Sequence, residues 1–130
     1  MDQIRSGSIV ITWDAQRRLA VLSYEAPVSA TGKDGRPLLE ALTRWVGDEG
    51  KPFYLLNDCG PLIQMDTEYR AGWWAFYRPH RDRAWCALYN LSPVIRIVAE
   101  MFRVATGLRI GIFRTEAEAR SWLLEKGCPQ

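Results

Sequence analysis

The sequence has little of the residues that most often build a catalytic or metal site. It contains one histidine, His80, and three cysteines that are widely spaced and form no CxxC pair. An odd number of isolated cysteines is typical neither of a disulfide framework nor of a zinc site, and it favours reduced thiols in a cytosolic compartment. No cofactor motif is present, so we expect neither a metal nor a cofactor.

Long apolar segments and a strong net charge are also missing. The first seven residues have no apolar signal core, and the longest run without a charge, 84–95, is too short to span a bilayer. The net charge of +2 is too small to indicate nucleic acid or an anionic membrane as a partner. These absences predict a cytoplasmic protein that neither binds nucleic acid nor inserts into a membrane.

The composition is that of an ordinary globular domain. Hydrophobic residues make up 48% and charged residues 25% of the 130 positions. A chain of this length can bury a core without metals or disulfides. No internal repeat, linker or low-complexity segment divides it, so we expect one domain over residues 1–130.

The first half of the chain predicts a hairpin, a helix and a buried strand. In residues 8–13 and 18–24 apolar side chains recur at every second position, which predicts two strands joined by a four-residue turn. A loop follows, and then a helix with Asp34 as its cap, Pro37 in its first turn and Gly47 at its end. The helix carries one apolar stripe made by Leu38, Leu39, Leu42, Trp45 and Val46.

The second half alternates helices and strands. A buried strand over 53–56 precedes a helix over about 66–78, which Pro79 stops. The later elements are a strand at 84–89, a helix from the Ser92 cap to Gly107, a strand at 108–113, and a last helix opened by a Thr115–Glu118 capping box. The Ser92 helix has apolar residues at helical spacing: Val94, Ile97, Val98, Met101, Phe102 and Ala105. This order predicts an α/β fold with a mixed, mainly parallel five-stranded sheet and four helices.

Three segments make the chain resemble the SpoIIAA-like family. They are the pair Trp13-Asp14 in the first turn, the strand end 54–58, and the closing R-x-x-x-F…E-A…W-L pattern over 109–123. The family has the STAS fold of bacterial anti-sigma factor antagonists and is related to the lipid-carrying CRAL-TRIO domains. The resemblance therefore implies a STAS-like fold and a role in regulation or protein interaction.

The same resemblance implies a phosphorylation site, but the usual residue is replaced. Antagonists carry a Met-Asp-Ser-Ser-Gly motif, whose second Ser is the one usually phosphorylated. The matching residues here are 65–69, so Thr67 falls on the first Ser and Glu68 on the second. The regulatory Ser is absent. Thr67 is a weak candidate acceptor, and its simpler interpretation is an N-cap hydroxyl.

The turn after the 53–56 strand is where an α/β enzyme would hold a nucleophile. Cys59 lacks the arginine that a phosphatase-type thiol would need six positions on, because Met65 stands there. His80 lies past the far end of the next helix, so we interpret Cys59 as a structural thiol. The acids Asp58, Asp66 and Glu68 either complement the helix dipole or hold a cation. We find no catalytic set and do not expect an enzyme.

The aromatic helix after this turn is the most unusual segment. We expect Tyr69, Trp73, Phe76 and Tyr77 to face inward. Arg70, Trp74 and Arg78 lie on the adjoining face and indicate a contact surface, unless Trp74 only covers a loop. The basic turn over 78–83 either attracts phosphate groups or is simply solvated.

Two functions follow as hypotheses. The first is a STAS-like regulatory module that docks a protein partner or a second copy, as a homodimer. Its candidate binding residues are Asn57, Asp58, Cys59, Thr67, Glu68, Arg70, Trp74 and Arg78. The alternative, implied by the CRAL-TRIO relatives, is a small carrier of a lipid or other apolar ligand in a cavity between helices and sheet.

Overall fold

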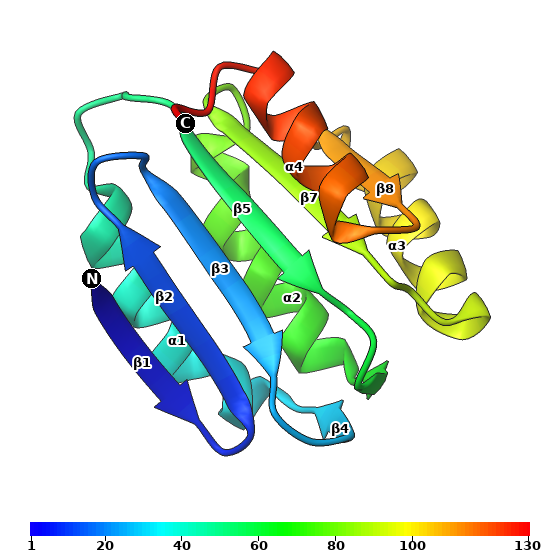
Figure 1. Ribbon diagram of the computed structural model, residues 1–130. Helices are drawn as coiled ribbons and strands as arrows, with labels where there is room; N and C mark the ends of the chain where they lie inside the picture. Colours follow the sequence, from blue (N-terminus) through cyan, green and yellow to red (C-terminus); the bar gives the residue numbers. More distant parts are fainter.

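A twisted sheet separates two layers of helices in the computed structural model, which describes residues 1–130 (Figure 1). The sheet order is β1-β2-β3-β5-β7-β8; the first three strands pair antiparallel and the last four pair parallel. These strands are β1 (Asp2–Ser6), β2 (Ile9–Asp14), β3 (Leu19–Tyr24), β5 (Phe53–Asp58), β7 (Ala84–Tyr89) and β8 (Ile110–Phe113). Two short strands, β4 (Val28–Ala30) and β6 (Leu62–Met65), form a separate pair.

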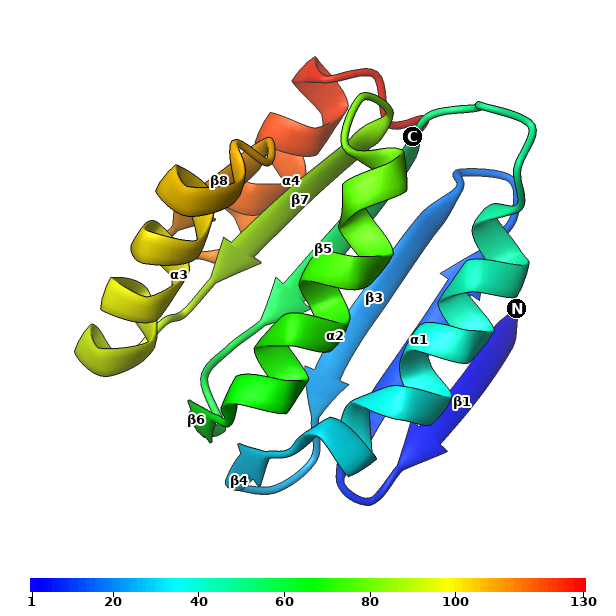
Figure 2. The ribbon, with the colours of Figure 1, turned by 180° about the vertical axis from the view of Figure 1, so that it is seen from behind.

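Three helices cover one face of the sheet and a fourth covers the other (Figure 2). The first three are α1 (Gly32–Val46), α2 (Thr67–Tyr77) and α3 (Pro93–Thr106), and the fourth is α4 (Glu116–Glu125). One 3₁₀ turn, Arg78–His80, follows α2. None of the helices is both long and apolar enough to cross a membrane.

The expected α/β class, the four helices and the mainly parallel sheet are confirmed, but the predicted number of strands was wrong. The sheet has six strands, because β1 pairs along the outer edge of β2. Its five residues are polar apart from Ile4, and four of them lie outside the core on an edge, so no alternating pattern marked the strand. The connecting Gly7-Ser8 dipeptide, with Gly7 at a φ of +61°, was the available signal.

Two predicted helix caps were also wrong. Thr31, not Asp34, caps α1: its hydroxyl accepts from the Asp34 amide, and the Asp34 carboxylate accepts from the Thr31 amide in return. Asp66, not Thr67, caps α2, because its carboxylate accepts from the Tyr69 amide at 2.8 Å. Asp66 directly precedes Thr67, and Thr31 stands three positions before Asp34, which is the N3 residue of the capping box. The Ser92 cap of α3 and the left-handed Gly107 at its end formed as expected.

The apolar stripes of α1 and α2 face the sheet, whereas that of α3 does so only in part. Tyr69, Trp73, Phe76 and Tyr77 are all buried, as predicted. On α3 only Ile95 and Ala99 are buried. Four of its apolar residues are mostly exposed: Val94 (62%), Ile97 (61%), Met101 (66%) and Val104 (80%). The apolar arc of α3 is therefore wider than the sheet edge beneath it can cover.

Glycines allow α1 and α2 to approach closely, which sets the position of the α2 N-terminus. A Cβ on Gly32 would lie 2.5 Å from the Cβ of Glu68, and one on Gly35 would lie 3.0 Å from the Tyr69 ring. Only glycine fits position 32 at the present helix spacing, because Cβ atoms do not approach other carbons so closely, and an alanine at position 35 would make a tight contact with the Tyr69 ring.

We predict that Gly32→Ala destabilises the protein by about 1–3 kcal/mol, because the added carbon forces the two helices apart. Helix propensity alone favours alanine over glycine by about 1 kcal/mol, so it predicts that the substitution stabilises the protein. A loss of stability would therefore report the steric contact with α2. Urea unfolding measures the effect. The control is Gly72→Ala, whose Cβ meets only the mobile end of Leu39. A Gly32→Ala protein as stable as the wild type would contradict this account of the helix contact.

Candidate functional site

The turn after β5 is fixed to the end of β7 at the carboxyl edge of the sheet. The Asp58 carboxylate accepts from the Gly60 amide at 3.0 Å and from the Asn90 side-chain amide at 3.3 Å. The Cys59 amide donates to the Tyr89 carbonyl at 3.0 Å. A Cβ on Gly60 would lie 2.3 Å from the Asn90 amide nitrogen, so a larger residue there would displace the Asn90 side chain from Asp58. The predicted turn thus presents a well-defined surface.

The carboxylates near this edge serve separate contacts. Asp58 holds the turn, Asp66 caps α2, and Glu68 lies exposed against the first turn of α1. Burial, together with Asp58 and Glu116, raises the pKa of Tyr89 to about 12. No three His, Cys, Asp or Glu side chains lie close enough together to hold a metal ion.

Cys59 and His80 lie at opposite ends of β5. Cys59 follows the last residue of the strand, whereas His80 packs on Phe53, its first residue, with ring centroids 5.8 Å apart. A six-residue strand spans roughly 20 Å, so no Cys/His pair forms. Cys59 is also only 2% exposed, and burial, then Cys86 and Asp58, raise the pKa of its thiol.

His80 is held in place by Arg83, which indicates a structural role. Its Nδ1 lies 2.8 Å from an Arg83 guanidinium nitrogen. A guanidinium can only donate, so Nδ1 accepts and the ring is neutral. Burial, and then the charge of Arg83, lower the pKa of His80.

The face of α2 predicted to be exposed is only partly so. Arg78 and Thr67 are exposed, while Trp74 is half-buried and packs against the main core. Arg70 is also half-buried, and its guanidinium donates to the Thr67 hydroxyl at 3.3 Å. Of the three residues predicted for this face, only Arg78 is therefore fully exposed, and Arg70 and Trp74 are partly covered.

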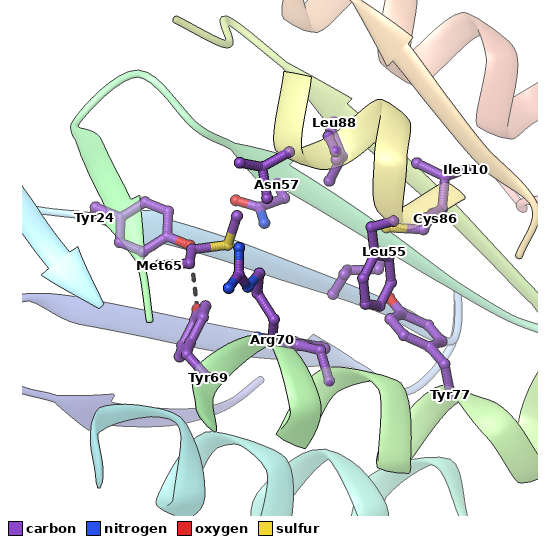
Figure 3. A pocket seen from close by; sticks show the side chains of 14 residues that line it. Tyr24, Leu55, Asn57, Met65, Tyr69, Arg70, Tyr77, Cys86, Leu88 and Ile110 are labelled. Atoms are coloured by element: carbon purple, nitrogen blue, oxygen red, sulfur yellow. Dashed lines mark hydrogen bonds between the residues drawn. The ribbon is translucent and has the colours of Figure 1, made fainter. Parts of the chain in front are cut away.

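A cavity of about 80 Å³ lies between α2, α3 and the sheet, and we call it the α2–α3 cavity (Figure 3). Tyr24, Asn57 and Arg70 lie at one end, and Cys86, Ile110 and Tyr77 at the other. The remaining lining residues are Leu55, Met65, Tyr69, Trp73, Leu88, Val98, Ala99 and Phe102. Sequence patterns did not identify this set, since it depends on how α2 and α3 pack over four strands.

Polar atoms in this cavity lack part of their hydrogen bonding. The hydroxyls of Tyr24 and Tyr69 bond to each other at 3.2 Å. Two other buried polar atoms have no partner in the protein, namely the Asn57 Oδ1 and the Tyr77 hydroxyl. Burial raises the pKa of all three tyrosines, so their hydroxyls stay protonated.

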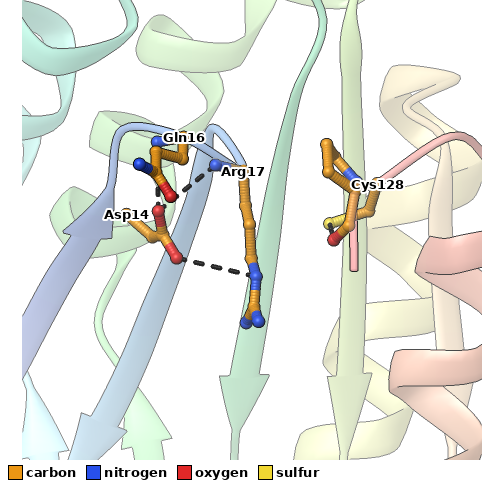
Figure 4. A network of polar contacts seen from close by, with 5 residues as sticks. Asp14, Gln16, Arg17 and Cys128 are labelled. Atoms are coloured by element: carbon orange, nitrogen blue, oxygen red, sulfur yellow. Dashed lines mark hydrogen bonds and ion pairs between the residues drawn. The ribbon is translucent and has the colours of Figure 1, made fainter.

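The hairpin turn between β2 and β3 is held by Asp14 (Figure 4). Its carboxylate accepts from the amides of Gln16 and Arg17 at 3.0 and 3.2 Å, and it pairs with the Arg17 side chain at 3.7 Å. Asp14 therefore has a structural role here. Cys128, the third cysteine, is buried nearby, and burial raises the pKa of its thiol.

We predict that all three thiols react slowly in the folded protein. Cys59, Cys86 and Cys128 are buried, and their raised pKa values leave little thiolate at about pH 8. A disulfide-exchange reagent followed by mass spectrometry measures each site, and the urea-unfolded chain is the control. Fast native labelling of Cys59 would show that this thiol is activated and contradict its structural role.

We predict that His80 titrates below its ordinary pKa of 6.5. Because the folded state disfavours the protonated ring, the stabilisation is present above the ordinary pKa and is lost as the pH falls through the lowered pKa. Wild type should then lose more unfolding free energy between about pH 8 and pH 5 than His80→Gln. Proton NMR resolves the only histidine directly, and a pKa above 6.5 would refute the account.

Solved structures share this fold, although neither a scan against protein-family models nor a search of curated proteins found a match. A STAS domain protein from Planctomyces limnophilus, described as an anti-sigma-factor antagonist, superposes with a TM-score of 0.65 at 15% identity, over 89% of this chain and 97% of that one. Apo-SiaC from Pseudomonas aeruginosa superposes with a TM-score of 0.61 at 14% identity, over 87% of this chain and 99% of that one.

A third structure is the complex of the P. aeruginosa diguanylate cyclase SiaD with its activator SiaC. A chain of this complex gives a TM-score of 0.60 at 13% identity, over 88% of this chain and 100% of that one. At such low identities the likeness establishes the fold alone. It agrees with the order of strands and helices described above and with the family resemblance of the sequence. The protein therefore has a STAS-like fold, the fold of anti-sigma-factor antagonists.

Proposed function

We propose that the protein is a regulatory module that acts by binding another protein. The observation that carries this proposal is the exposed apolar stripe of α3, which consists of Val94, Ile97, Met101 and Val104. These residues are three, four and three positions apart, which is the a/d spacing of a helix that packs on another helix. Contiguous exposed apolar surface of this kind marks protein-interaction sites.

The stripe lies on the same side of the sheet as α2, which carries several of the residues that the sequence predicted for binding (Figure 2). Asn90, just before α3, bonds to Asp58 in the β5–β6 turn, and α2 and α3 share the walls of one cavity. The proposed docking surface thus combines the α3 stripe with Asn57, Asp58, Thr67, Glu68, Arg70, Trp74 and Arg78. Cys59 is buried, so its contribution is to hold the turn.

The structural relatives support a role in protein binding. SiaC is described as the activator of the diguanylate cyclase SiaD and is seen in complex with it. The sequence resemblance aligns Glu68 with the antagonists' regulatory Ser, so we propose a constitutive docking surface that carries a negative charge at this position. Thr67 is exposed and remains a weak candidate acceptor.

A carrier of whole lipids is the less favoured alternative. The α2–α3 cavity of about 80 Å³ has the room of about three water molecules. Pockets for drug-sized ligands are typically about 300–1,000 Å³. A lipid chain of ordinary length does not fit this cavity, whereas a partner helix on the α3 stripe needs no enclosed volume.

We predict that Ile97→Asp and Met101→Asp each weaken partner binding by about tenfold or more, because a carboxylate would be desolvated in the interface. The partner is captured from an extract of the source cells on the immobilised wild-type protein, identified, purified and then titrated by calorimetry. Light scattering of the isolated protein tests a second copy as the occupant.

The matched control is Leu124→Asp, which changes an apolar residue that is 43% exposed on α4, on the opposite face. Trp74→Ala and Glu68→Arg test the α2 part of the docking surface separately. Equal affinity of wild type, Ile97→Asp and Met101→Asp for the captured partner would overturn the proposal.

A further inference from the structure

The α2–α3 cavity has the layout of a binding site for a small amphipathic molecule. Twelve of its fourteen lining residues are hydrophobic. Tyr24, Asn57 and Arg70 bring polar groups to one end, and the Tyr77 hydroxyl is the polar group at the other (Figure 3). Small-molecule sites usually combine an apolar lining with a few placed polar groups in this way. The cavity is distinct from the α3 stripe, whose four residues do not line it.

A cation without a carboxylate partner stands at the polar end. Arg70 takes part in none of the ion pairs of the protein, and its only side-chain hydrogen bond is to Thr67. Its guanidinium is directed toward the Asn57 amide (Figure 3). A half-buried guanidinium that is aimed into an apolar pocket is suited to a carboxylate, since its N–H groups match two carboxylate oxygens.

An unpartnered acceptor lies beside this cation. The Asn57 Oδ1 is buried and accepts no hydrogen bond from the protein. Such an atom costs stability unless a donor reaches it. A ligand that offers both a carboxylate and a neighbouring hydroxyl would satisfy Arg70 and Asn57 together.

We propose that the α2–α3 cavity binds a small carboxylic acid with a short apolar chain, its carboxylate on Arg70 and its chain directed toward Cys86. The volume of about 80 Å³ limits the enclosed chain to a few carbons. A hydroxyl on the carbon next to the carboxylate strengthens binding through Asn57. The proposal does not rest on partner binding, and its test uses the isolated protein.

NMR titration of the isotope-labelled protein tests the site with straight-chain carboxylates of about two to ten carbons, together with the matching primary amides and alcohols. We expect shifts at cavity residues, an optimum at about four to six carbons, and about tenfold weaker binding of the amides and alcohols. The matching 2-hydroxy acid binds several-fold more tightly than the plain acid.

Substitutions distinguish specific binding of the carboxylate at Arg70 from a nonspecific attraction of anions to the positive charges of the protein. Arg70→Met removes the cation but keeps the length of the side chain, and it should abolish the preference for acids over amides. Arg78→Met is the control, because Arg78 directly follows α2, is exposed and does not line the cavity. Ala99→Leu fills the cavity and should block binding in a protein whose spectrum stays native.

Three results would overturn the proposal: acids and amides that bind alike, an Arg70→Met protein with the affinity of the wild type, or shifts confined to residues outside the cavity. Because no partner protein is present in these experiments, their failure leaves the docking proposal intact. Unchanged partner binding in the α3 variants, which would overturn the docking proposal, would equally leave the ligand site intact.

Discussion

The structure depends on β5, a strand that is buried on both faces. Phe53 and Leu55 belong to the core beneath α1 and α2, whereas Tyr54 and Leu56 belong to the core beneath α4. Burial of side chains of this size contributes about 1.5–3 kcal/mol each, so one short strand stabilises both layers. Its pairing with β3 and β7 also fixes where the chain leaves the sheet. The turn that carries Asp58 and the start of α2 follow from that exit point.

Much of this could be predicted from local patterns. The hairpin, the four helices and the inward stripe of α2 each depend on residues close together in the chain, and all of them formed. The errors had two causes. The edge strand β1 has no apolar pattern, and two helix starts offered more than one capping residue within three positions, so Thr31 and Asp66 cap helices for which Asp34 and Thr67 were predicted. The apolar spacing of α3 predicted a helix but not how much of it the sheet would cover.

The same distinction holds for the candidate site: features set by nearby residues were predicted, and features set by the packing of distant elements were not. The sequence predicted the turn at Asp58 and a contact surface of Arg70, Trp74 and Arg78, because these lie on consecutive elements; only Arg78 of the three is fully exposed. It could not predict the α2–α3 cavity, whose polar end joins Tyr24, Asn57 and Arg70 from β3, β5 and α2. The exposure of Val94, Ile97, Met101 and Val104 likewise follows from the position of α3 at the sheet edge. Both features place binding capacity on the face that α1, α2 and α3 share.

The central claim is that this face docks a partner protein through α3. Hydrogen–deuterium exchange of the protein alone and in its purified complex tests it most directly, since backbone amides report protection along the whole chain. The account predicts that the complex slows exchange in residues 93–106 and in the turn around Asp58, and leaves α4 unchanged. Protection confined to α4 or to the β1 edge, with α3 exchanging as in the free protein, would contradict it.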